Sequence, residues 1–309
     1  MRNLSKDIKA HRPILIQPTV AASFLERASA VNIPLGAKAS DFAEMLQAMF
    51  GAQGVLEKFP PYAVIPVRGV IGKNLSDLDK MCGCCDIHDV EEMLEDCVRD
   101  ESVKVIILDV DSPGGTSVGV PELAKRVREC PKRVVSFTSN ECCSAAYWIA
   151  SQASEFYATP SSSVGSIGCY IAYNDMSKAF ADEGVTVDVI RSGKVKGAGI
   201  PGTSLTAEQR KMLLDEVVEI HEDFKADVKA VREFVSDDSM EGLTFSGKKA
   251  AEAGLVTSLV NGFDELMESM DAAVAAQMEA DEENDERAEG AEADEDDESD
   301  YDDEEDSGW

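Results

Sequence analysis

Short apolar runs alternate with helix-compatible segments over residues 62–190, and this alternation constrains the fold more than any other feature of the chain. The runs are rich in Val and Ile, which favour strands, and each has the length of a buried strand. Strands that alternate with helices build a mainly parallel sheet covered by helices. The sequence therefore predicts an α/β fold with strands at residues 62–67, 103–110, 133–137, 166–171 and 185–190, and helices near residues 88–99, 117–130, 143–153 and 174–183.

The chain is long enough for one large core with appendages, since 44% of its 309 residues are hydrophobic. Residues 1–58 carry small apolar clusters and are predicted to form a helical arm, followed by the α/β domain at residues 59–276. A helix near residues 206–234 has one apolar face, which we expect to pack on the core or on another subunit. A closing helix is expected near residues 262–276, and the tail at residues 277–309 is predicted to be disordered because it has almost no apolar side chains.

Acidic residues dominate the charge of this chain. The formal net charge is −31, and residues 279–309 contribute 18 of these charges through 19 acidic residues and the single Arg287. Such an excess repels phosphates and argues against direct binding to nucleic acid or anionic lipid. The tail either docks on a basic partner surface or simply keeps the protein in solution, and the sequence leaves both interpretations open.

The sequence predicts a soluble, cytoplasmic protein. No apolar run approaches the length of about 18 residues expected of a membrane span, and the first residues lack the apolar stretch of a secretory signal peptide. Eight cysteines, three of them crowded as Cys82, Cys84 and Cys85, fit a reducing compartment better than a disulfide framework. This cluster lies near His88 but lacks the paired ligand spacing of a structural zinc site, so we expect free thiols and no metal.

A serine and a lysine stand out as candidates for catalysis. Ser144 begins an apolar helix and Lys196 lies in a Gly-rich loop some fifty residues later. Serine hydrolases usually use histidine as the base, and none of the three histidines lies in a segment that resembles a catalytic triad. Taken alone, Ser144 is interpreted by default as a helix N-cap and Lys196 as a solvated surface residue. Cys143, adjacent to the serine, is a rival nucleophile.

A glycine-rich loop follows one of the predicted strands. Asp111-Ser-Pro-Gly-Gly115 leads from the strand at residues 103–110 into a helix, so its amides emerge beside a positive helix terminus. Backbone amides in such a place can stabilise an oxyanion. The same residues also form ordinary tight turns, and the loop alone does not decide between the two interpretations.

Several motifs in this order resemble the signal peptide peptidase A family of serine proteases. The resemblance covers roughly residues 62–262 and rests on Asp111-Ser-Pro-Gly-Gly115, Ser144-Ala-Ala-Tyr-Trp148, Val164-Gly-Ser-Ile-Gly168, Ser192-Gly-Lys-Val-Lys196 and Gly254-Leu-Val256. It implies a spiral of strand-strand-helix units of the Clp protease and crotonase type for residues 59–276. Proteases of the Clp type place a histidine roughly two dozen residues after the serine, and the matching stretch here has none.

The resemblance also implies a catalytic set. Ser144 corresponds to the nucleophile, Lys196 to the general base, and Ser166 to the serine whose hydroxyl orients the lysine amine. The oxyanion hole is implied at the amides of Gly114 or Gly115 together with that of Ala145. Family members carry a tyrosine immediately before the lysine, whereas this chain has Val195. No cofactor is implied.

The resemblance finally suggests an assembly and a biological role. In relatives with one such domain per chain, the serine and lysine of one site come from neighbouring subunits of a ring. The charged C-terminal extension makes the chain most similar to the head maturation proteases of tailed phages, which process capsid and scaffold proteins, so the prohead or the host cytoplasm is the expected location. Two alternatives stay open: a soluble bacterial peptidase that degrades peptides, and a catalytically idle scaffolding protein on the same fold.

Overall fold

The computed structural model describes residues 14–16 and 54–274. Two compact units make up the chain, residues 1–261 and residues 262–309. Most of the predicted N-terminal arm at residues 1–58 and the predicted acidic tail at residues 277–309 lie outside the described residues. Their structures and the predicted domain boundaries therefore stay predictions.

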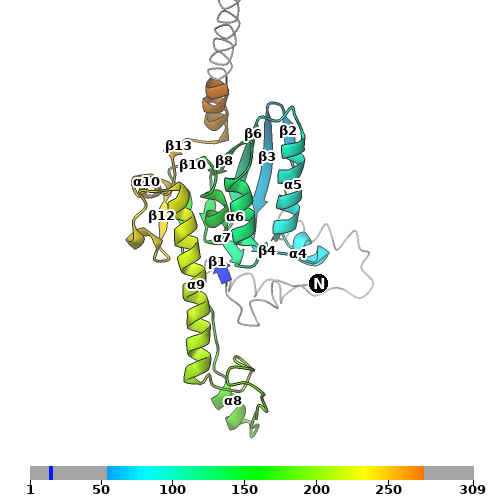
Figure 1. Ribbon diagram of the computed structural model, residues 1–309, viewed down its shortest axis with the longest axis vertical. Coiled ribbons are helices and arrows are strands. Elements are labelled where there is room, and N and C mark those ends of the chain that lie inside the picture. Colours follow the sequence, from blue (N-terminus) through cyan, green and yellow to red (C-terminus); the bar gives the residue numbers. More distant parts are fainter. Residues whose placement is uncertain (1–13, 17–53, 275–309) are drawn as a thin grey trace, which may run out of the picture. The chain divides into compact units, whose positions relative to one another are not determined.

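A six-stranded sheet forms the centre of the first unit, in the order β13-β10-β8-β6-β3-β2 (Figure 1). All neighbouring strands run parallel except β2 and β3. Residues 106–108 of β6 are fully buried, as expected for a strand covered on both faces. These strands confirm the prediction of a mainly parallel α/β fold; they are β2 (Glu57–Phe59), β3 (Tyr62–Arg68), β6 (Val105–Asp111), β8 (Arg133–Thr138), β10 (Glu155–Ala158) and β13 (Ser258–Leu259).

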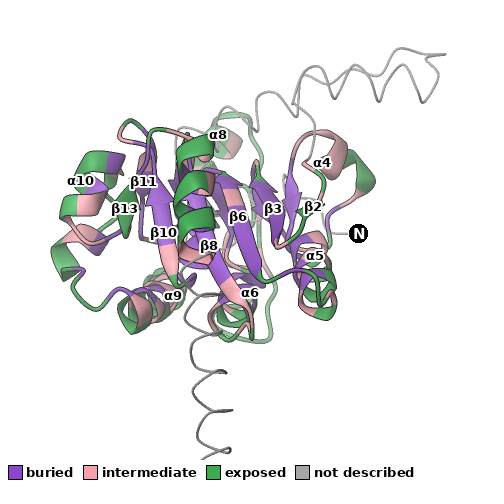
Figure 2. Ribbon diagram, turned by 90° about the horizontal axis from the view of Figure 1, so that it is seen from above, coloured by how far each residue is buried: buried purple, intermediate pink, exposed green. Residues whose placement is uncertain are grey.

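Helices follow the strands as the alternation predicted. In α5, four buried positions, Ile87, Val90, Leu94 and Cys97, recur at helical spacing and face the core. Figure 2 shows α5 and α6 on the same face of the sheet, with the central strands β3, β6 and β8 coloured mostly as buried. The described helices of the first unit are α4 (Asp77–Met81), α5 (Ile87–Arg99), α6 (Val120–Arg128), α7 (Ala145–Ala150), α8 (Ser177–Asp182), α9 (Ala207–Val231), the 3-10 helix η1 (Asp237–Met240) and α10 (Gly247–Glu252).

Two small sheets lie beside the main sheet, and the sequence did not predict them. One has the order β1-β7-β4-β5, and the other has the order β12-β11-β9. Their strands have only two or three residues, too few for a periodic pattern to show. They are β1 (Ile14–Ile16), β4 (Ile71–Gly72), β5 (Cys85–Asp86), β7 (Gly114–Thr116), β9 (Glu141–Cys143), β11 (Ser163–Gly165) and β12 (Thr244–Ser246).

Two predicted strands are wrong. In place of the strand expected at residues 166–171, the observed strand, β11, lies earlier in the sequence and ends at Gly165, because the next residue, Ser166, has a φ of 54° that a strand does not allow. The segment expected at residues 185–190 forms no strand and pairs with no strand among the described residues. Its β-branched residues favour an extended backbone, yet a strand also needs a neighbour to accept its hydrogen bonds.

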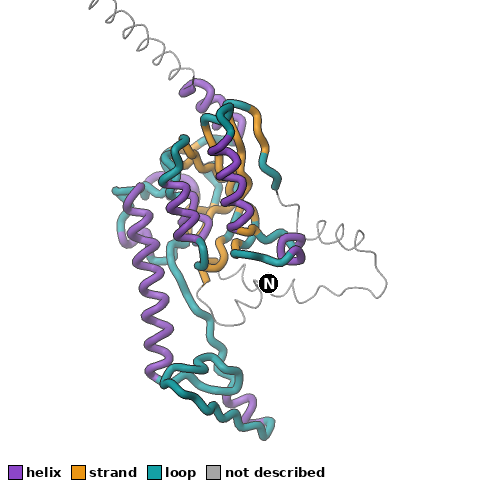
Figure 3. The backbone as a smooth tube through the Cα atoms, turned by 45° about the vertical axis from the view of Figure 1, so that its right-hand side comes forward, coloured by secondary structure: helices purple, strands orange, loops and turns teal. Residues whose placement is uncertain are grey.

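A second feature, here called the projecting arm, extends from the core and consists of α8, the loop that follows it and the first half of α9. The segment with α8 lies at the far end of α9, away from the main sheet (Figures 1 and 3). The Thr206 hydroxyl accepts the N–H of Gln209 and caps α9, and the N–H of Thr206 donates to Oε1 of Gln209, which completes a capping box. Phe224 and Val228, near the end of α9, are fully buried, whereas Leu214 and Val218 are 58% and 48% exposed. The helix therefore anchors on the core through its C-terminal half.

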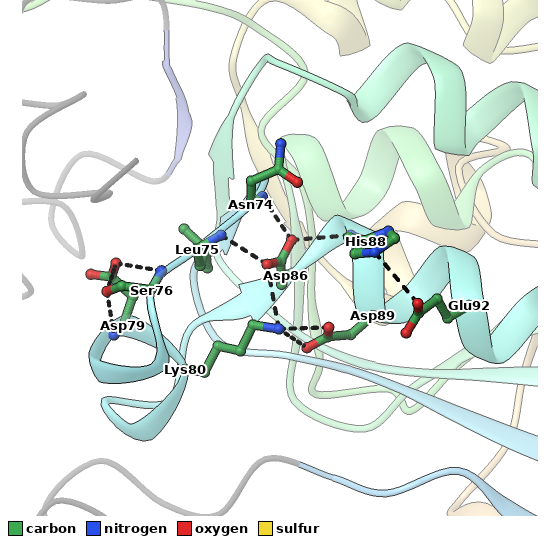
Figure 4. Close-up of polar contacts among 9 residues, drawn as sticks. All are labelled: Asn74, Leu75, Ser76, Asp79, Lys80, Asp86, His88, Asp89 and Glu92. Atoms are coloured by element: carbon green, nitrogen blue, oxygen red, sulfur yellow. Dashed lines mark hydrogen bonds and ion pairs between the residues drawn. The ribbon is translucent and has the colours of Figure 1, made fainter. Parts of the chain in front are cut away.

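A buried carboxylate holds the turn after β4 in place (Figure 4). Asp86 is 2% exposed and accepts the backbone N–H groups of Asn74 at 3.0 Å and Leu75 at 2.8 Å. It also accepts the N–H of His88 at 3.0 Å and thereby caps α5. Because β4 pairs with β7, this network supports the strand that contains Gly114 and Gly115, the glycine pair.

The second unit contains one described helix, at residues 263–274, close to the closing helix predicted at residues 262–276. Within residues 14–16 and 54–274, no helix is long and apolar enough to cross a membrane. Over the same residues, no cluster of three or more His, Cys, Asp or Glu side chains is arranged to hold a metal ion.

Candidate active site

Three segments of the chain meet at one edge of the core. Ser112 pairs with Cys142 in a parallel bridge, and Cys143 pairs with Gly165 where β9 and β11 run parallel. The N–H of Ser144 donates to the carbonyl of Gly165 at 2.7 Å. Parallel pairing brings the ends of these strands together, so Ser144 and Ser166 follow directly on paired residues. The structure thus brings the loop at residues 111–115 together with Ser144 and Ser166.

Ser144 occupies a strained turn between β9 and α7. Its backbone has φ 55° and ψ −121°, a conformation that usually costs a non-glycine residue about 1–3 kcal/mol. The side chain makes no capping hydrogen bond to α7, so it does not act as an N-cap in the way its position suggested. Ser144 is 1% exposed. Strain of this kind persists only where the surrounding structure imposes it.

Ser166 adopts a second left-handed conformation directly after β11. Its φ is 54°, and its N–H donates to the carbonyl of Leu243 at 2.6 Å. The preceding Gly165 pairs with Cys143 on one side and with Thr244 on the other. Ser166 is 9% exposed and is therefore fixed by backbone pairing on both flanks of its strand.

The glycine pair forms β7 next to α7. Gly114 has φ 99°, which only glycine adopts without strain. A Cβ on Gly115 would lie 1.9 Å from the carbonyl oxygen of Ile71, so the close approach of β4 requires glycine there as well. The N–H of Gly114 donates to the hydroxyl of Ser112 at 3.2 Å. Ala145 is the first residue of α7, where an N–H has no acceptor within the helix.

Lys196 is not brought to Ser144 within the protomer. It is exposed and lies in a turn between α8 and α9, where its N–H donates to the carbonyl of Gly193 at 3.2 Å. That turn belongs to the projecting arm, and Figure 1 shows the segment with α8 far from α7. Val195 beside it is 38% exposed. The two halves of the predicted dyad therefore stand apart in a single chain.

Cys143 is a poor rival nucleophile in this setting. Burial, followed by the nearby Glu141 carboxylate, raises the pKa of its thiol to about 12. The sulfur lies 3.7 Å from the carbonyl oxygen of Ser163, which accepts a weak S–H hydrogen bond. Because the thiolate is the reactive form, a thiol with this pKa reacts slowly at neutral pH.

Sequence reasoning missed the anchor between the nucleophile helix and the arm. Asp227 of α9 accepts hydrogen bonds from the indole Nε1 of Trp148 at 2.8 Å and from Arg128 at 2.7 Å. Trp148 stacks on Phe224 with ring centroids 4.4 Å apart and planes 5° apart. The available signal was an acidic residue three positions after Phe224 and directly before Val228, within the apolar stripe of α9.

Comparison with known proteins places this site in a protein family. Residues 126–277 match peptidase family S49. The chain contains a peptidase family S49 domain. The match includes Ser144, Ser166 and Lys196 and confirms the resemblance to signal peptide peptidase A proteases.

Phage proteins are among the relatives of this S49 chain. It is 29% identical over 290 residues to the head-tail preconnector protein GP5 of Enterobacteria phage P21, covering 86% of this chain and 57% of that protein. It is 30% identical over 217 residues to the capsid assembly protease C of Escherichia phage lambda, covering 68% and 49%. The chain thus spans about half the length of these curated relatives. Among solved structures, a ClpP1 mutant from Listeria monocytogenes matches 66% of this chain and 94% of its own, with 13% identity and a TM-score of 0.43.

Proposed function

We propose that this S49 domain is a serine endopeptidase in which Ser144 attacks the peptide carbonyl and Lys196 of a neighbouring subunit takes its proton. The observation that carries the proposal is the strained turn at Ser144, next to the glycine strand and to Ser166. A serine held in such a turn at the start of a helix is suited to nucleophilic attack, because the hydroxyl is not used to cap the helix.

The proposed acyl transfer uses four groups: the Ser144 hydroxyl, the lysine amine, the amide of Ala145 and the glycine pair. The Ser144 hydroxyl loses its proton to the lysine amine as its oxygen adds to the substrate carbonyl. The oxyanion of the tetrahedral intermediate is stabilised by the amide of Ala145 and by the glycine pair, and one such donor typically contributes about 3 kcal/mol. The lysine then protonates the leaving amine, and water hydrolyses the acyl-enzyme by the reverse use of the same groups.

A lysine base has to be neutral when it accepts the proton. A free lysine has a pKa of about 10.4, and burial in a dry environment lowers it. Lys196 is exposed in the protomer, so the proposal requires a contact that covers its amine. In the proposed site, the Ser166 hydroxyl accepts a hydrogen bond from this amine and orients it.

The arm offers an apolar surface for a neighbouring subunit. A groove of about 360 Å³ lies where residues 169–173 meet the first half of α9. Its lining includes Tyr170, Leu205, Leu213 and Val217, together with Leu214, which is 58% exposed. An apolar surface on the same arm as the loop with the proposed base favours a second copy of this chain as the partner. A ring of subunits would repeat this contact and complete every site.

The names of the relatives support a substrate class. One is a head-tail preconnector protein and another is a capsid assembly protease, both from phages. We therefore propose capsid or scaffold proteins as substrates, processed in the prohead or the host cytoplasm. Degradation of peptides by a soluble bacterial enzyme is the alternative role for the same chemistry.

Labelling with a fluorophosphonate, which reacts with activated serines, tests the proposed chemistry. We expect the wild-type protein and the control Ser163→Ala to be labelled, and Ser144→Ala to be unlabelled. Co-expression with a candidate capsid protein should then show processing by the wild type and none by Ser144→Ala. Absence of labelling in the wild type, or processing that persists in Ser144→Ala, would favour the idle scaffolding protein or another nucleophile.

A further inference from the structure

A strand from the N-terminal part of the chain lies on the glycine strand. β1 pairs antiparallel with β7, so that Ile14, Leu15 and Ile16 lie opposite Thr116, Gly115 and Gly114. β1 is the outermost strand of its sheet, and β7 is covered on its other edge by β4. Without β1, the outer edge of β7 would present unpaired backbone groups. Such an edge readily accepts an extended peptide.

The direction of this pairing points β1 toward the proposed nucleophile. β7 begins next to the site, because Gly114 follows Ser112, which pairs with the residue two positions before Ser144. An antiparallel strand on β7 therefore runs toward the site, and Ile16 is its nearest residue. An extended peptide substrate that added to the same edge would approach the serine with the same polarity.

We propose that residues 14–16 are a built-in occupant of the peptide-binding edge of β7 and compete there with peptide substrates. This inference rests on the proposed function, since it identifies the edge of β7 as the surface that the substrate uses. The N-terminal segment has to leave β7 before a substrate can pair with it. The activity of the proposed peptidase is therefore limited by release of its own chain.

Burial of the proposed catalytic groups supports a state in which the peptide-binding edge is occupied. Ser144 is 1% exposed, and Gly114 and Gly115 are buried, so a substrate carbonyl reaches them only after covering atoms move. In the sequence, Pro13 and Pro18 flank the apolar residues of β1. Proline lacks the N–H that a strand donates, which limits the segment to a short stretch of pairing.

A short strand is suited to reversible occupation. Each backbone hydrogen bond contributes about 1 kcal/mol net, and a three-residue strand makes only a few of them. Attachment to the same chain raises the effective concentration of β1 at β7 into about the millimolar range. A substrate that pairs over more residues than β1 can displace it.

Hydrogen exchange of the full-length protein tests the pairing without any need for catalysis. Leu15→Pro removes one N–H and bends the strand, whereas the matched control Leu15→Ala keeps the backbone donor. We expect amides of β7, at residues 114–116, to exchange at least tenfold faster in Leu15→Pro than in Leu15→Ala, while the amides of β6 and β8 stay protected. Equal exchange at residues 114–116 in the two variants would overturn the pairing.

Peptide binding tests the competition. The probe is a fluorescent peptide with the sequence of residues 11–20, measured by anisotropy on proteins that also carry Ser144→Ala, so that no cleavage occurs. We expect the peptide to bind the Leu15→Pro protein at least tenfold more tightly than the Leu15→Ala protein. Equal affinities, or no binding to either protein, would contradict the proposal. A protein that shows this competition but no fluorophosphonate labelling with Ser144 intact would retain the docking edge and lose only the proposed peptidase function.

Discussion

The indole N–H of Trp148 donates a 2.8 Å hydrogen bond to the carboxylate of Asp227 and so ties the nucleophile helix to the arm. Arg128 binds the other oxygen of the same carboxylate at 2.7 Å. Directly behind Ser144, the helix α7 is thus fastened to α9, whose far end carries the loop with Lys196. The position of the proposed base relative to its neighbours depends on this contact.

Loss of the Asp227 carboxylate should loosen the arm. Asp227→Ala leaves the indole N–H and the Arg128 guanidinium without this acceptor, and we expect the free energy of unfolding to fall by about 1–3 kcal/mol. Asp215→Ala on the same helix is the control, because its 2.6 Å pair with Lys211 is largely exposed and such pairs contribute about 0.5 kcal/mol or less. Urea denaturation measures both variants. Equal losses would show that Asp227 is not an anchor.

The strain at Ser144 predicts an unusual response to glycine. In an ordinary helix, exchange of alanine for glycine costs about 1 kcal/mol, and Ala146→Gly in α7 should show this loss. At position 144 the left-handed φ favours glycine. We therefore expect the free energy of unfolding of Ser144→Gly to be at least as large as that of Ser144→Ala. A loss of about 1 kcal/mol from Ser144→Ala to Ser144→Gly would contradict the strained turn.

Gly115 should tolerate no side chain. In Gly115→Ala the new Cβ would lie 1.9 Å from the carbonyl oxygen of Ile71, so β4 and β7 have to separate. We expect a loss of about 1–3 kcal/mol in stability and a marked fall in fluorophosphonate labelling. Gly193→Ala, where no atom lies within 4 Å of the added Cβ, is the matched control and should leave stability unchanged. Wild-type melting temperatures for both Gly115→Ala and Gly193→Ala would contradict the close approach of β4 to β7 at Gly115.

The raised pKa of Cys143 predicts slow alkylation. Burial and Glu141 raise the thiol pKa to about 12, so the neutral form dominates at pH 7 and the thiolate appears only as the pH approaches 12. We expect iodoacetamide to modify Cys143 in the folded protein far more slowly than a free cysteine at pH 7–9, as measured by mass spectrometry of the digest. Cys143→Ala should retain fluorophosphonate labelling. Rapid alkylation at pH 7, or loss of labelling in Cys143→Ala, would support the cysteine as nucleophile.

The sequence predicted three strands of the main sheet, β3, β6 and β8, because they are long enough to show their composition, whereas β2, β10 and β13 have only two to four residues and were not predicted. Val105–Asp111 and its neighbours have runs of β-branched residues that are buried in the structure. The three-residue strands β7, β9 and β11 escaped notice, since they are defined by partners that lie far apart in the sequence. Residues 185–190 show the opposite error, because their strand-like composition finds no partner among the described residues.

The candidate site was predicted in part for similar reasons. Ser144, Ser166 and the glycine pair were found through motifs, and they lie together because parallel strands end at the same edge. The occupation of β7 by residues 14–16 could not be predicted, since three apolar residues between two prolines do not specify which edge they join. The separation of Lys196 from Ser144 within one chain depends on the length and direction of α9, which a motif does not contain.

The most direct test of the central claim is complementation between two inactive variants. Ser144→Ala and Lys196→Ala are each expected to lose peptide hydrolysis, measured with a fluorogenic peptide. When the two chains are co-expressed and purified together, mixed assemblies contain sites with an intact serine from one chain and an intact lysine from another. We predict that hydrolysis returns to about a quarter of the wild-type rate, as expected for random mixing of two chains in equal amounts. Mixed assemblies that stay inactive, or a Lys196→Ala protein that hydrolyses the peptide at the wild-type rate, would contradict the account.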